Sequence, residues 1–414
     1  MTLIWMVQFL LIKHIVLGDH FSDPIFEKKS IEQNRQDGYW IEALRSNNQQ
    51  KIKQLVAYGL TQGQINLYDL TNPTGQRIIQ KLDSPVAMDH ADFTGDGFQD
   101  VVICFQYGRT MLDCDRDGGK IVWLENPGLD KSDQRFWKNH YVGKSTAMHR
   151  LKIGHFTQTQ RWEIIGLPIV GQPNDLLSVV PVILFQQPEH VLNATEWPQK
   201  IINQEYYHVI HDAKLIKKDQ LDSLLIASRE GISWLYFDPM KNQWTIEHIG
   251  AGESQKAFSG SGSVDVGTIE HDTFAYIATA EPFHGNTVAV YTKSMNTPWK
   301  RYVLDVYGQP NEQGEGSIHH IVCADFDNDG DDEFLVALRG PSPNEGVYYY
   351  KSIDLSRGLF HKWKVTNDSA ARITLSDFDD DGRLDFATIS YAVPGYYVSP
   401  NPSVNIFYNN NSST

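Results

Sequence analysis

The stretch that decides the fold is residues 325–333, with the sequence DFDNDGDDE, followed by the apolar run FLVAL at residues 334–338. Carboxylates at alternate positions, a glycine that permits a sharp turn and a closing acid can place several oxygens around a hard cation such as Ca²⁺ or Mg²⁺. The apolar run that follows is typical of a buried β-strand. The stretch therefore predicts a β-hairpin whose loop is closed by a metal ion.

The same unit recurs as DFTGDGFQD at residues 92–100 and as DFDDDGRLD at residues 377–385, and an apolar run follows each copy. We expect these loops to bind Mg²⁺ or Ca²⁺ as structural staples, since nothing in them resembles a reaction centre. The copy at residues 92–100 is degenerate, because a threonine replaces an acid and a phenylalanine offers only its carbonyl group. The predicted ligands are Asp92, Thr94, Asp96, Phe98 and Asp100, then Asp325, Asp327, Asp329 and Glu333, and finally Asp377, Asp379, Asp381 and Asp385.

Weaker copies of the hairpin bring the number of repeats to seven. Their apolar runs are centred on Val56, Val102, Ile165, Leu225, Ile277, Leu335 and Phe386, which gives a mean period of 55 residues. A period of this size with several short strands is the signature of a propeller blade. The sequence thus predicts an all-β, seven-bladed β-propeller with FG-GAP/VCBS-type metal-binding hairpin loops over residues 25–408. Residues 1–24 form an apolar N-terminal segment and residues 409–414 a tail.

The net charge and the apolar first residues bear on which partners and which location the protein has. A formal charge of -15 without a Lys/Arg cluster argues against nucleic acid or an anionic membrane as partner. The first twelve residues are apolar but too few to span a membrane, and a signal peptide is as good an interpretation as a mature N-terminus. The location, secreted or cytoplasmic, stays open. Residues 25–33 are expected to supply the strand that closes the last blade.

Polar side chains gather at the start and end of the inner strands, on the rim opposite the predicted metal loops. Imidazoles recur there, and with a pKa near 6.5 they are suited to moving protons at neutral pH. A lone histidine at a strand start is usually structural, but several aimed at one mouth favour a site. We expect this rim to bind a small sugar through Arg35, Tyr39, Asp89, His90, His208, Glu281, His284, His319, Arg372 and Tyr391, and His149 and His211 are placed at the same rim.

Several longer blocks carry a family resemblance. They are RQDGYWIEA (35–43), GGKIVWLENPG (118–128), MHRLKIGHFT (148–157), AEPFHGNTVAVYTK (280–293), GSIHHIVCADFDNDGDDEFLVA (316–337) and ATISYAVPGYYVSPNPSVNIF (387–407). They resemble the propeller domain of fungal aldos-2-ulose dehydratase/isomerase. That family joins a seven-bladed propeller to two cupin domains and a lectin-like domain, converts 1,5-anhydro-D-fructose to ascopyrone M and then microthecin, and acts on glucosone.

The resemblance has consequences for individual residues. It matches the family's dehydration histidines to His149 and His211 and its magnesium loop to residues 92–100. It also implies that Zn²⁺ is not expected, because the zinc-binding cupin is absent, and that the isomerisation step is in doubt. One departure is Asp89-His90, where the family has histidine followed by tyrosine.

The resulting hypothesis is a carbon–oxygen lyase that removes water from a 2-keto sugar by β-elimination. One of His149 and His211 takes the C3 proton, the other assists departure of the C4 hydroxyl, and Arg35, Tyr39, His284 and His319 polarise the carbonyl group. A homodimer or a separate cupin protein could complete the site. Two alternatives stay open: a non-catalytic carbohydrate-binding or adhesion propeller, and a polysaccharide lyase, although a lyase acting on uronates would need a cationic groove.

Overall fold

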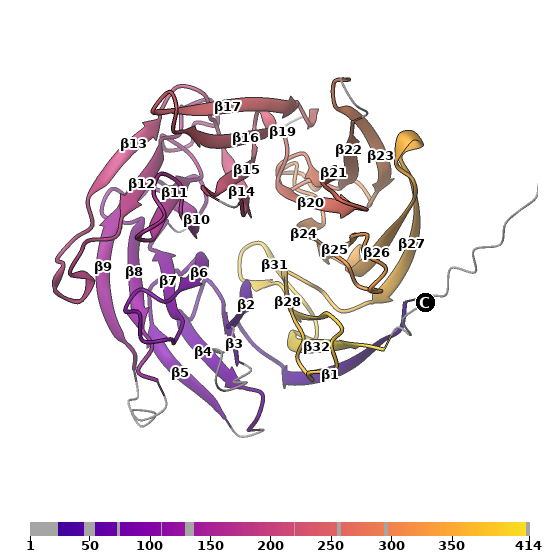
Figure 1. Cartoon of the computed structure of the whole chain (residues 1–414). Coiled ribbons are helices and arrows are strands. Elements are labelled where there is room, and N and C mark those ends of the chain that lie inside the picture. Colours follow the sequence, from indigo (N-terminus) through magenta and orange to yellow (C-terminus); the bar gives the residue numbers. More distant parts are fainter. Residues whose placement is uncertain are drawn as a thin grey trace, which may run out of the picture.

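The computed structural model describes residues 24–44, 54–72, 75–108, 110–128, 136–218, 220–254, 258–293 and 297–410. The described strands form seven four-stranded antiparallel sheets arranged in a ring around a central axis (Figure 1). The seven-bladed β-propeller predicted from the repeats is therefore confirmed. The predicted apolar segment lies outside the described residues except for its last residue.

Each of the first four blades is a meander of consecutive strands. Blade 1 comprises β2 (Trp40–Leu44), β3 (Gln54–Tyr58), β4 (Gln64–Asp69) and β5 (Gln76–Lys81). Blade 2 comprises β6 (Ala87–Ala91), β7 (Asp100–Phe105), β8 (Lys120–Glu125) and β9 (Lys138–Lys144). Blade 3 comprises β10 (Met148–Gly154), β11 (Glu163–Pro168), β12 (Val182–Gln186) and β13 (Gln199–Asn203). Blade 4 comprises β14 (Ile210–Ile216), β15 (Ser223–Ser228), β16 (Gly231–Asp238) and β17 (Gln243–Gly250).

Blades 5 and 6 follow the same plan, and blade 7 takes its fourth strand from the other end of the chain. Blade 5 comprises β20 (Ser263–Ile269), β21 (Asp272–Glu281), β22 (Thr287–Thr292) and β23 (Lys300–Val306). Blade 6 comprises β24 (Ile318–Ala324), β25 (Glu333–Arg339), β26 (Glu345–Asp354) and β27 (Leu359–Thr366). Blade 7 comprises β28 (Arg372–Ser376), β29 (Asp385–Ile389), β32 (Ser403–Asn409) and β1 (Phe26–Gln33).

Small elements complete the described chain. Two short hairpins pair β18 (Glu253–Ser254) with β19 (Ser259–Gly260) and β30 (Ala392–Val393) with β31 (Tyr397–Val398). Two 3₁₀ turns, η1 (Val191–Asn193) and η2 (Leu355–Arg357), are the only helical elements of the described residues. None of the helical segments described here has the length and hydropathy that crossing a bilayer requires.

The ring is closed by pairing the two ends of the chain. Strand β1 runs antiparallel to β32, with Phe26 opposite Asn409, so the predicted closing strand at residues 25–33 is confirmed. The Phe26 ring packs edge-on against Phe386 at 5.1 Å and against Phe326 of blade 6 at 6.1 Å. The outer edge of β32 is thereby covered, which removes an exposed pairing edge.

Burial follows strand position within each blade. The second strand is sandwiched between two neighbouring blades, and all residues of β11, β15, β25 and β29 are buried. Fourth strands such as β27 alternate between exposed and half-buried residues, because one face meets solvent. All seven apolar runs found in the sequence form second strands, since continuous burial requires continuous apolar sequence.

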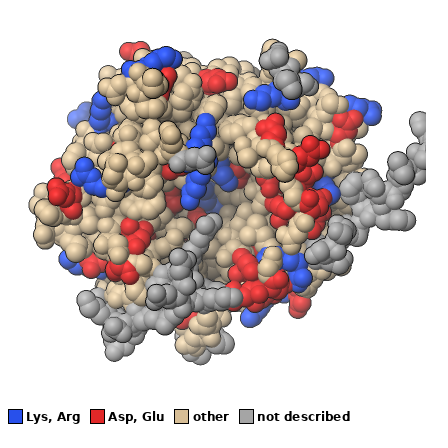
Figure 2. Space-filling model, in the orientation of Figure 1, with Lys and Arg blue, Asp and Glu red and all other residues tan. Residues whose placement is uncertain are grey.

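Acidic loops lie at one end of the inner strands, and the polar residues of the predicted sugar site lie at the other end. The acidic loops at residues 92–99, 325–332 and 377–384 connect the first and second strands of blades 2, 6 and 7. The polar residues at the starts of the first strands lie at the opposite end of the same strands. Figure 2 shows one face of the ring with a hollow at its centre, where Lys and Arg side chains gather, and with acidic patches over the surrounding blades.

Candidate active site

Three inner strands carry a β-bulge at the same height, and the extra residue is a histidine each time. The pairing of β10 with β11 shifts between Met148 and Arg150, and equivalent shifts occur at the starts of β14 and β24. A bulge leaves one residue out of the ladder and re-aims its side chain, and such bulges are frequent beside active sites. The residues outside the ladder are His149, His211 and His319.

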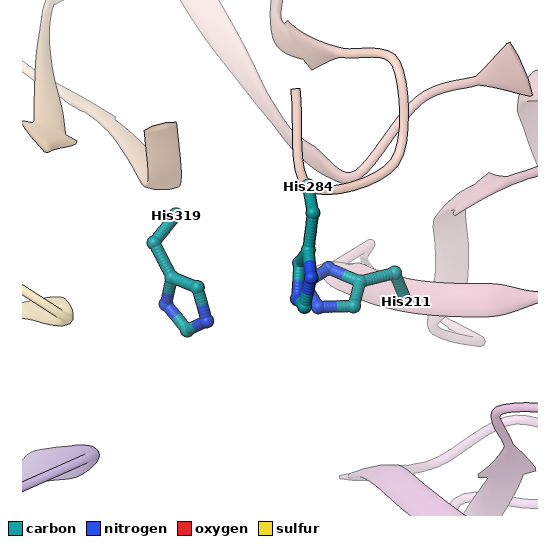
Figure 3. Close-up of side chains that lie close together, drawn as sticks. All are labelled: His211, His284 and His319. Atoms are coloured by element: carbon teal, nitrogen blue, oxygen red, sulfur yellow. The ribbon is translucent and has the colours of Figure 1, made fainter. Parts of the chain in front are cut away.

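Three imidazoles from blades 4, 5 and 6 form what we call the histidine cluster, namely His211, His284 and His319 (Figure 3). Each offers one ring nitrogen, and these nitrogens lie within 4.8 Å of one another. Hydrogen bonds determine which nitrogens are free. Nδ1 of His211 donates to the carbonyl oxygen of Gly262 at 2.5 Å, and Nδ1 of His319 donates to that of Ala371 at 2.6 Å. Their Nε2 atoms are buried and have no partner in the described part of the chain.

A carboxylate orients the third member of the cluster. Oε1 of Glu315 lies 3.3 Å from Nδ1 of His284, and its Oε2 accepts a hydrogen bond from Nη2 of Arg339 at 3.1 Å. Burial opposes ionisation of Glu315, but the His284 hydrogen bond and the Arg339 charge prevail and lower its pKa to about 2. The ionised carboxylate therefore accepts from Nδ1 of His284 and leaves Nε2 free. This carboxylate–histidine pairing is the usual support of a metal-binding imidazole.

Burial keeps these imidazoles neutral. It lowers the pKa of His211 and His319 well below the ordinary value, with further lowering from His284 and Arg339 respectively, and it also lowers the pKa of His284. A neutral imidazole with a free lone pair is the form that binds a transition metal. Three imidazole nitrogens are also the donor set of catalytic zinc sites that keep a fourth position open. The donor set of the histidine cluster thus fits such an ion.

His149 and two tyrosines border the histidine cluster. The His149 ring lies 5.2 Å from the His211 ring, while the Tyr39 and Tyr391 rings lie 5.3 Å and 5.4 Å from the His319 ring. Burial, reinforced by the adjacent Arg150, lowers the pKa of His149 well below its ordinary value. The structure therefore brings together six of the residues predicted at the mouth, namely Tyr39, His149, His211, His284, His319 and Tyr391.

A charged layer lies next to the histidines, because the residues after His149, His211 and Ala371 also belong to the inner strands. Oδ1 of Asp212 lies 3.7 Å from Nε of Arg150 and 4.0 Å from Nη2 of Arg372. The Arg372 guanidinium stacks on the Trp40 indole, with its central carbon 3.5 Å from the ring centroid. Arg372, a predicted substrate ligand, thus belongs to this layer of buried charges.

Three other predicted sugar ligands are held elsewhere. Arg35 binds Glu32 and Tyr68, both at 2.7 Å, between the outer strand β1 and the third strand β4. Glu281 accepts hydrogen bonds from Tyr291 and Arg301 within blade 5. His208 pairs with Glu230 at 2.7 Å and is partly exposed. The structure gives these three side chains partners other than the histidine cluster.

Asp89 and His90 lie lower on the ring axis. Oδ2 of Asp89 accepts a hydrogen bond from the backbone N–H of Ile153, which follows His149 by four residues on β10. At roughly 3.3 Å per residue, the backbone N–H that the Asp89 carboxylate contacts lies about 13 Å along β10 from His149. Strand β6 has no register shift, so the next residue, His90, is not re-aimed toward the mouth.

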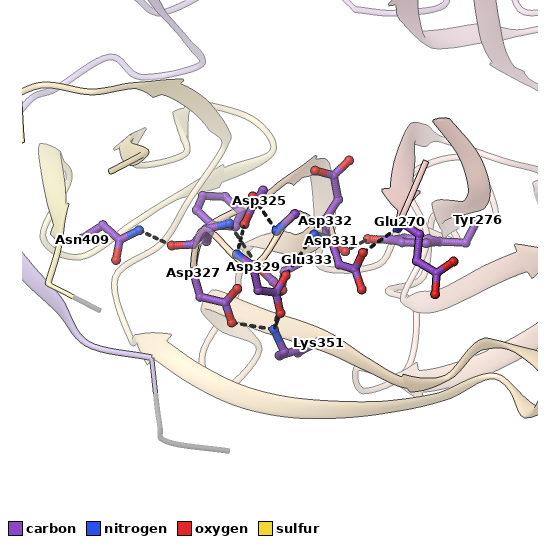
Figure 4. Close-up of polar contacts among 12 residues, drawn as sticks. Glu270, Tyr276, Asp325, Asp327, Asp329, Asp331, Asp332, Glu333, Lys351 and Asn409 are labelled. Carbon is purple, nitrogen blue, oxygen red and sulfur yellow. Dashed lines mark hydrogen bonds and ion pairs between the residues drawn. The ribbon is translucent and has the colours of Figure 1, made fainter. Parts of the chain in front are cut away.

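The three acidic loops differ in how their carboxylates are used. In the blade 6 loop, Nζ of Lys351 lies 2.5 Å from Asp327, 2.6 Å from Asp329 and 3.0 Å from Glu333 (Figure 4). In the blade 7 loop, ligand atoms of Asp377, Asp379 and Asp385 lie within 4.8 Å of one another.

In the blade 2 loop, Asp92 accepts backbone N–H bonds from Gly95 and Gly97, while burial raises the pKa of Asp100 to about 7. Metal binding by the three loops stays a prediction.

Glu315, Asp212 and Trp40 were not predicted as site residues, and the zinc expectation considered only the cupin domain. A usable signal was present for the bulged strands. His149-Arg150, His211-Asp212 and His319-His320 are adjacent polar pairs at the starts of inner strands. The signal is not sufficient by itself, because Asp89-His90 is also such a pair and its strand β6 has no register shift.

Comparison with known proteins agrees with this architecture. The family model described as aldos-2-ulose dehydratase, beta-propeller domain, matches residues 118–294. Aldos-2-ulose dehydratase from Phanerodontia chrysosporium is 39% identical over 419 residues, which cover 93% of this chain and 46% of that protein. The chain thus spans about half the length of this relative.

A solved structure supports the fold alone. The beta-propeller domain of Cps50 (Swd1) from Myceliophteria thermophila matches with a TM-score of 0.50 at 8% identity, covering 92% of this chain and 99% of that one. The similarity to aldos-2-ulose dehydratase is stronger evidence than this structural match, since 39% identity extends over 93% of the chain. The resemblance noted in the sequence is confirmed: the chain is similar to aldos-2-ulose dehydratase over most of its length, and residues 118–294 match that enzyme's β-propeller domain.

Proposed function

We propose that this chain is a carbohydrate dehydratase that removes water from a 2-keto sugar, either 1,5-anhydro-D-fructose, giving an ascopyrone-type enolone, or glucosone. The observation that carries the proposal is the histidine cluster, in which three imidazole nitrogens converge beside His149. The name of the relative from Phanerodontia chrysosporium supports the reaction class. An isomerisation step would need a domain or partner outside the described ring.

The histidine cluster would hold a Zn²⁺-type ion through His211, His284 and His319. Such an ion, when bound, supplies a Lewis acid that polarises a carbonyl oxygen and so acidifies the neighbouring C–H bond. Glu315 and the two backbone carbonyls keep the imidazoles in the orientation that binding requires. His211 therefore moves from the predicted acid–base pair to the ligand set.

The remaining protic groups beside the cluster are suited to the sugar itself. Tyr39 and Tyr391 carry hydroxyl groups held by Arg150 and Arg339, both at 3.3 Å, and they are suited to binding sugar hydroxyls. His149 lies outside the ligand set but within reach of the same substrate. We therefore assign to His149 a contact with the C3–C4 region, where the proton and the hydroxyl are lost.

Turnover is tested directly by incubating the purified chain with 1,5-anhydro-D-fructose and following the ultraviolet absorption of a conjugated enolone. His149→Ala should lower the rate by about 10²- to 10⁴-fold, the usual contribution of one proton-handling group. His208→Ala is the matched control, since its imidazole pairs with Glu230 away from the cluster. Unchanged turnover in His149→Ala refutes the assignment, and sugar binding without turnover favours the carbohydrate-binding alternative.

Metal content is a second, independent test. Elemental analysis of the purified chain should find one zinc-type ion per molecule in addition to any Mg²⁺ or Ca²⁺. His284→Ala should lose that ion, because two imidazoles rarely retain it, whereas His208→Ala should keep it. Equal zinc content in both variants would show that the histidine cluster is not the metal site.

A further inference from the structure

The hydrogen bonding of His149 differs from that of the histidine cluster. Nη1 of Arg150 lies 3.0 Å from Nε2 of His149 and also donates to the His149 carbonyl oxygen at 3.0 Å. A guanidinium group has five donors and no acceptor. Nε2 of His149 must therefore be the acceptor, and its lone pair is already used.

The proton of His149 consequently sits on Nδ1. That atom is buried and has no partner within the described residues. The cluster histidines are the reverse, because they donate through Nδ1 and leave Nε2 free. At its bulge, His149 thus presents an N–H donor. At the equivalent bulges, His211 and His319 present an unprotonated ring nitrogen.

The Arg150 side chain is itself fixed on several sides. Nη2 donates to the Tyr39 hydroxyl at 3.3 Å, and Nε faces Asp212 at 3.7 Å. Its guanidinium also lies over the Trp40 ring, 5.2 Å from the centroid. Arg150 therefore cannot swing away from His149 without breaking several contacts, which makes it a rigid support.

We propose that Arg150 is a positioning residue that holds His149 as a neutral Nδ1–H imidazole, so that His149 serves as the hydrogen-bond donor to the departing hydroxyl group and not as the base. This inference rests on the proposed dehydratase function. A buried donor without a partner costs free energy, and such groups are retained where a ligand supplies the acceptor.

The elimination then balances as follows. The C3–H bond breaks, its electron pair forms the C3–C4 double bond, and the C4–O bond breaks with its electrons leaving on oxygen. The oxygen departs as water after receiving the proton removed from C3. The Nδ1–H group of His149 donates a hydrogen bond to that oxygen throughout and keeps its own proton. The Tyr39 hydroxyl, which accepts a hydrogen bond from Arg150 at 3.3 Å, relays the proton by accepting it from C3 while passing its own to that oxygen.

The tautomer is measurable without any substrate. In the ¹⁵N NMR spectrum of histidine-labelled protein, His149 should show a protonated Nδ1 and an unprotonated Nε2. Arg150→Met should shift it toward the Nε2–H tautomer, while Arg150→Lys should retain part of the original state because one donor remains. An Nε2–H tautomer in the wild-type chain overturns the inference even if neither variant folds.

Side-chain amides separate a donor from a base. Asparagine places its amide nitrogen near the Nδ1 position and glutamine near Nε2, and neither can act as a base. His149→Asn should therefore lose no more than about tenfold in turnover, whereas His149→Gln and His149→Ala should lose about 10²- to 10³-fold, the usual cost of removing one positioned donor. Equal losses in all three variants would overturn the donor role.

The two measurements distinguish the possible failures. If the wild-type chain shows no turnover, the proposed function fails, and the tautomer still decides whether Arg150 positions His149. If turnover is present but His149 is protonated on Nε2, the dehydratase function stands, and the proposed role of Arg150 in positioning His149 is refuted.

Discussion

At the scale of single residues, buried carboxylates in this ring behave in opposite ways according to their partners. Glu315 faces both His284 and Arg339, and its pKa falls to about 2. Burial of Glu281 outweighs the attraction of Arg301 and raises its pKa to about 7. The first is a fixed negative charge at physiological pH, while the second changes its protonation near neutrality.

Glu281 should therefore make stability depend on pH. Its folded-state pKa lies above the ordinary value of 4.5, so the folded chain binds more protons than the unfolded chain between about pH 4.5 and 7. Stability should fall as the pH rises through that window. The difference in unfolding free energy between the wild-type chain and Glu281→Gln should shift by about 2–3 kcal/mol against the wild type from pH 5 to pH 8.

Urea denaturation at both pH values measures this shift. Glu253→Gln is the control, because that carboxylate contacts the same Arg301 but is only half-buried. A pH-independent difference for Glu281→Gln would mean that Glu281 stays ionised throughout.

At the scale of elements, the blade 6 loop carries its own cation. Lys351 extends from β26 into the space between three carboxylates of the loop, with distances of 2.5–3.0 Å. The opposing position in blade 7 is Tyr408, next to the Phe386–Phe407 pair, and that loop has no such lysine. The blade 6 loop, with six acids, is thus neutralised by a lysine from β26, whereas the blade 7 loop, with five acids, has only its own Arg383, which pairs with Asp381.

Lys351→Met should convert the blade 6 loop from a lysine-neutralised loop to one that depends on Ca²⁺. In EDTA the variant should lose about 3 kcal/mol of stability, since removing one partner leaves the others unpaired. Ca²⁺ at a hundred times its Kd should restore about 2.7 kcal/mol. Thermal unfolding with and without Ca²⁺ measures both effects.

Lys362→Met is the matched control, because its partner Asp305 lies at the surface. A Lys351→Met variant that is as stable as wild type in EDTA, and indifferent to Ca²⁺, would show that the lysine does not replace a metal ion.

The elements also show what the sequence could and could not predict. All seven second strands were found because burial between blades imposes continuous apolar runs. The common height of His149 and His319 could be predicted, because these residues start equivalent strands. The free nitrogens of His211 and His319 could not be predicted, since these depend on carbonyl groups of the next blade, such as those of Gly262 and Ala371.

The partners of Arg35 could not be predicted for a related reason. It immediately precedes the first inner strand in the sequence, yet it packs with Glu32 and Tyr68 because the chain there is still leaving the outer strand β1. Sequence distance to a strand start does not show which side of the blade a side chain faces.

At the scale of the whole molecule, closure of the ring depends on one short strand. Phe26 is the apolar residue that anchors β1, with ring contacts to Phe326 of blade 6 and Phe386 of blade 7. These contacts join two blades as well as the two ends of the chain. The free energy of closure should therefore be sensitive to this single side chain.

Phe26→Ala should lower the free energy of unfolding by about 2 kcal/mol, roughly half the cost at a fully buried site, because Phe26 is half-buried. The neighbouring Ile25→Ala is the matched control, since Ile25 is 58% exposed. Urea denaturation of the two variants gives the comparison. Equal stabilities would mean that β1 is not anchored through its aromatic residue.

The pairing of β1 with β32 also orders events during synthesis on the ribosome. Strand β1 emerges first, and its partner is translated only after some 370 intervening residues have appeared. Blade 7 is thus the last to be completed, and the nascent chain must keep an unpaired strand from aggregating until then. Tyr391, which borders the histidine cluster, is translated equally late, so the candidate site is complete only when the whole circle has formed.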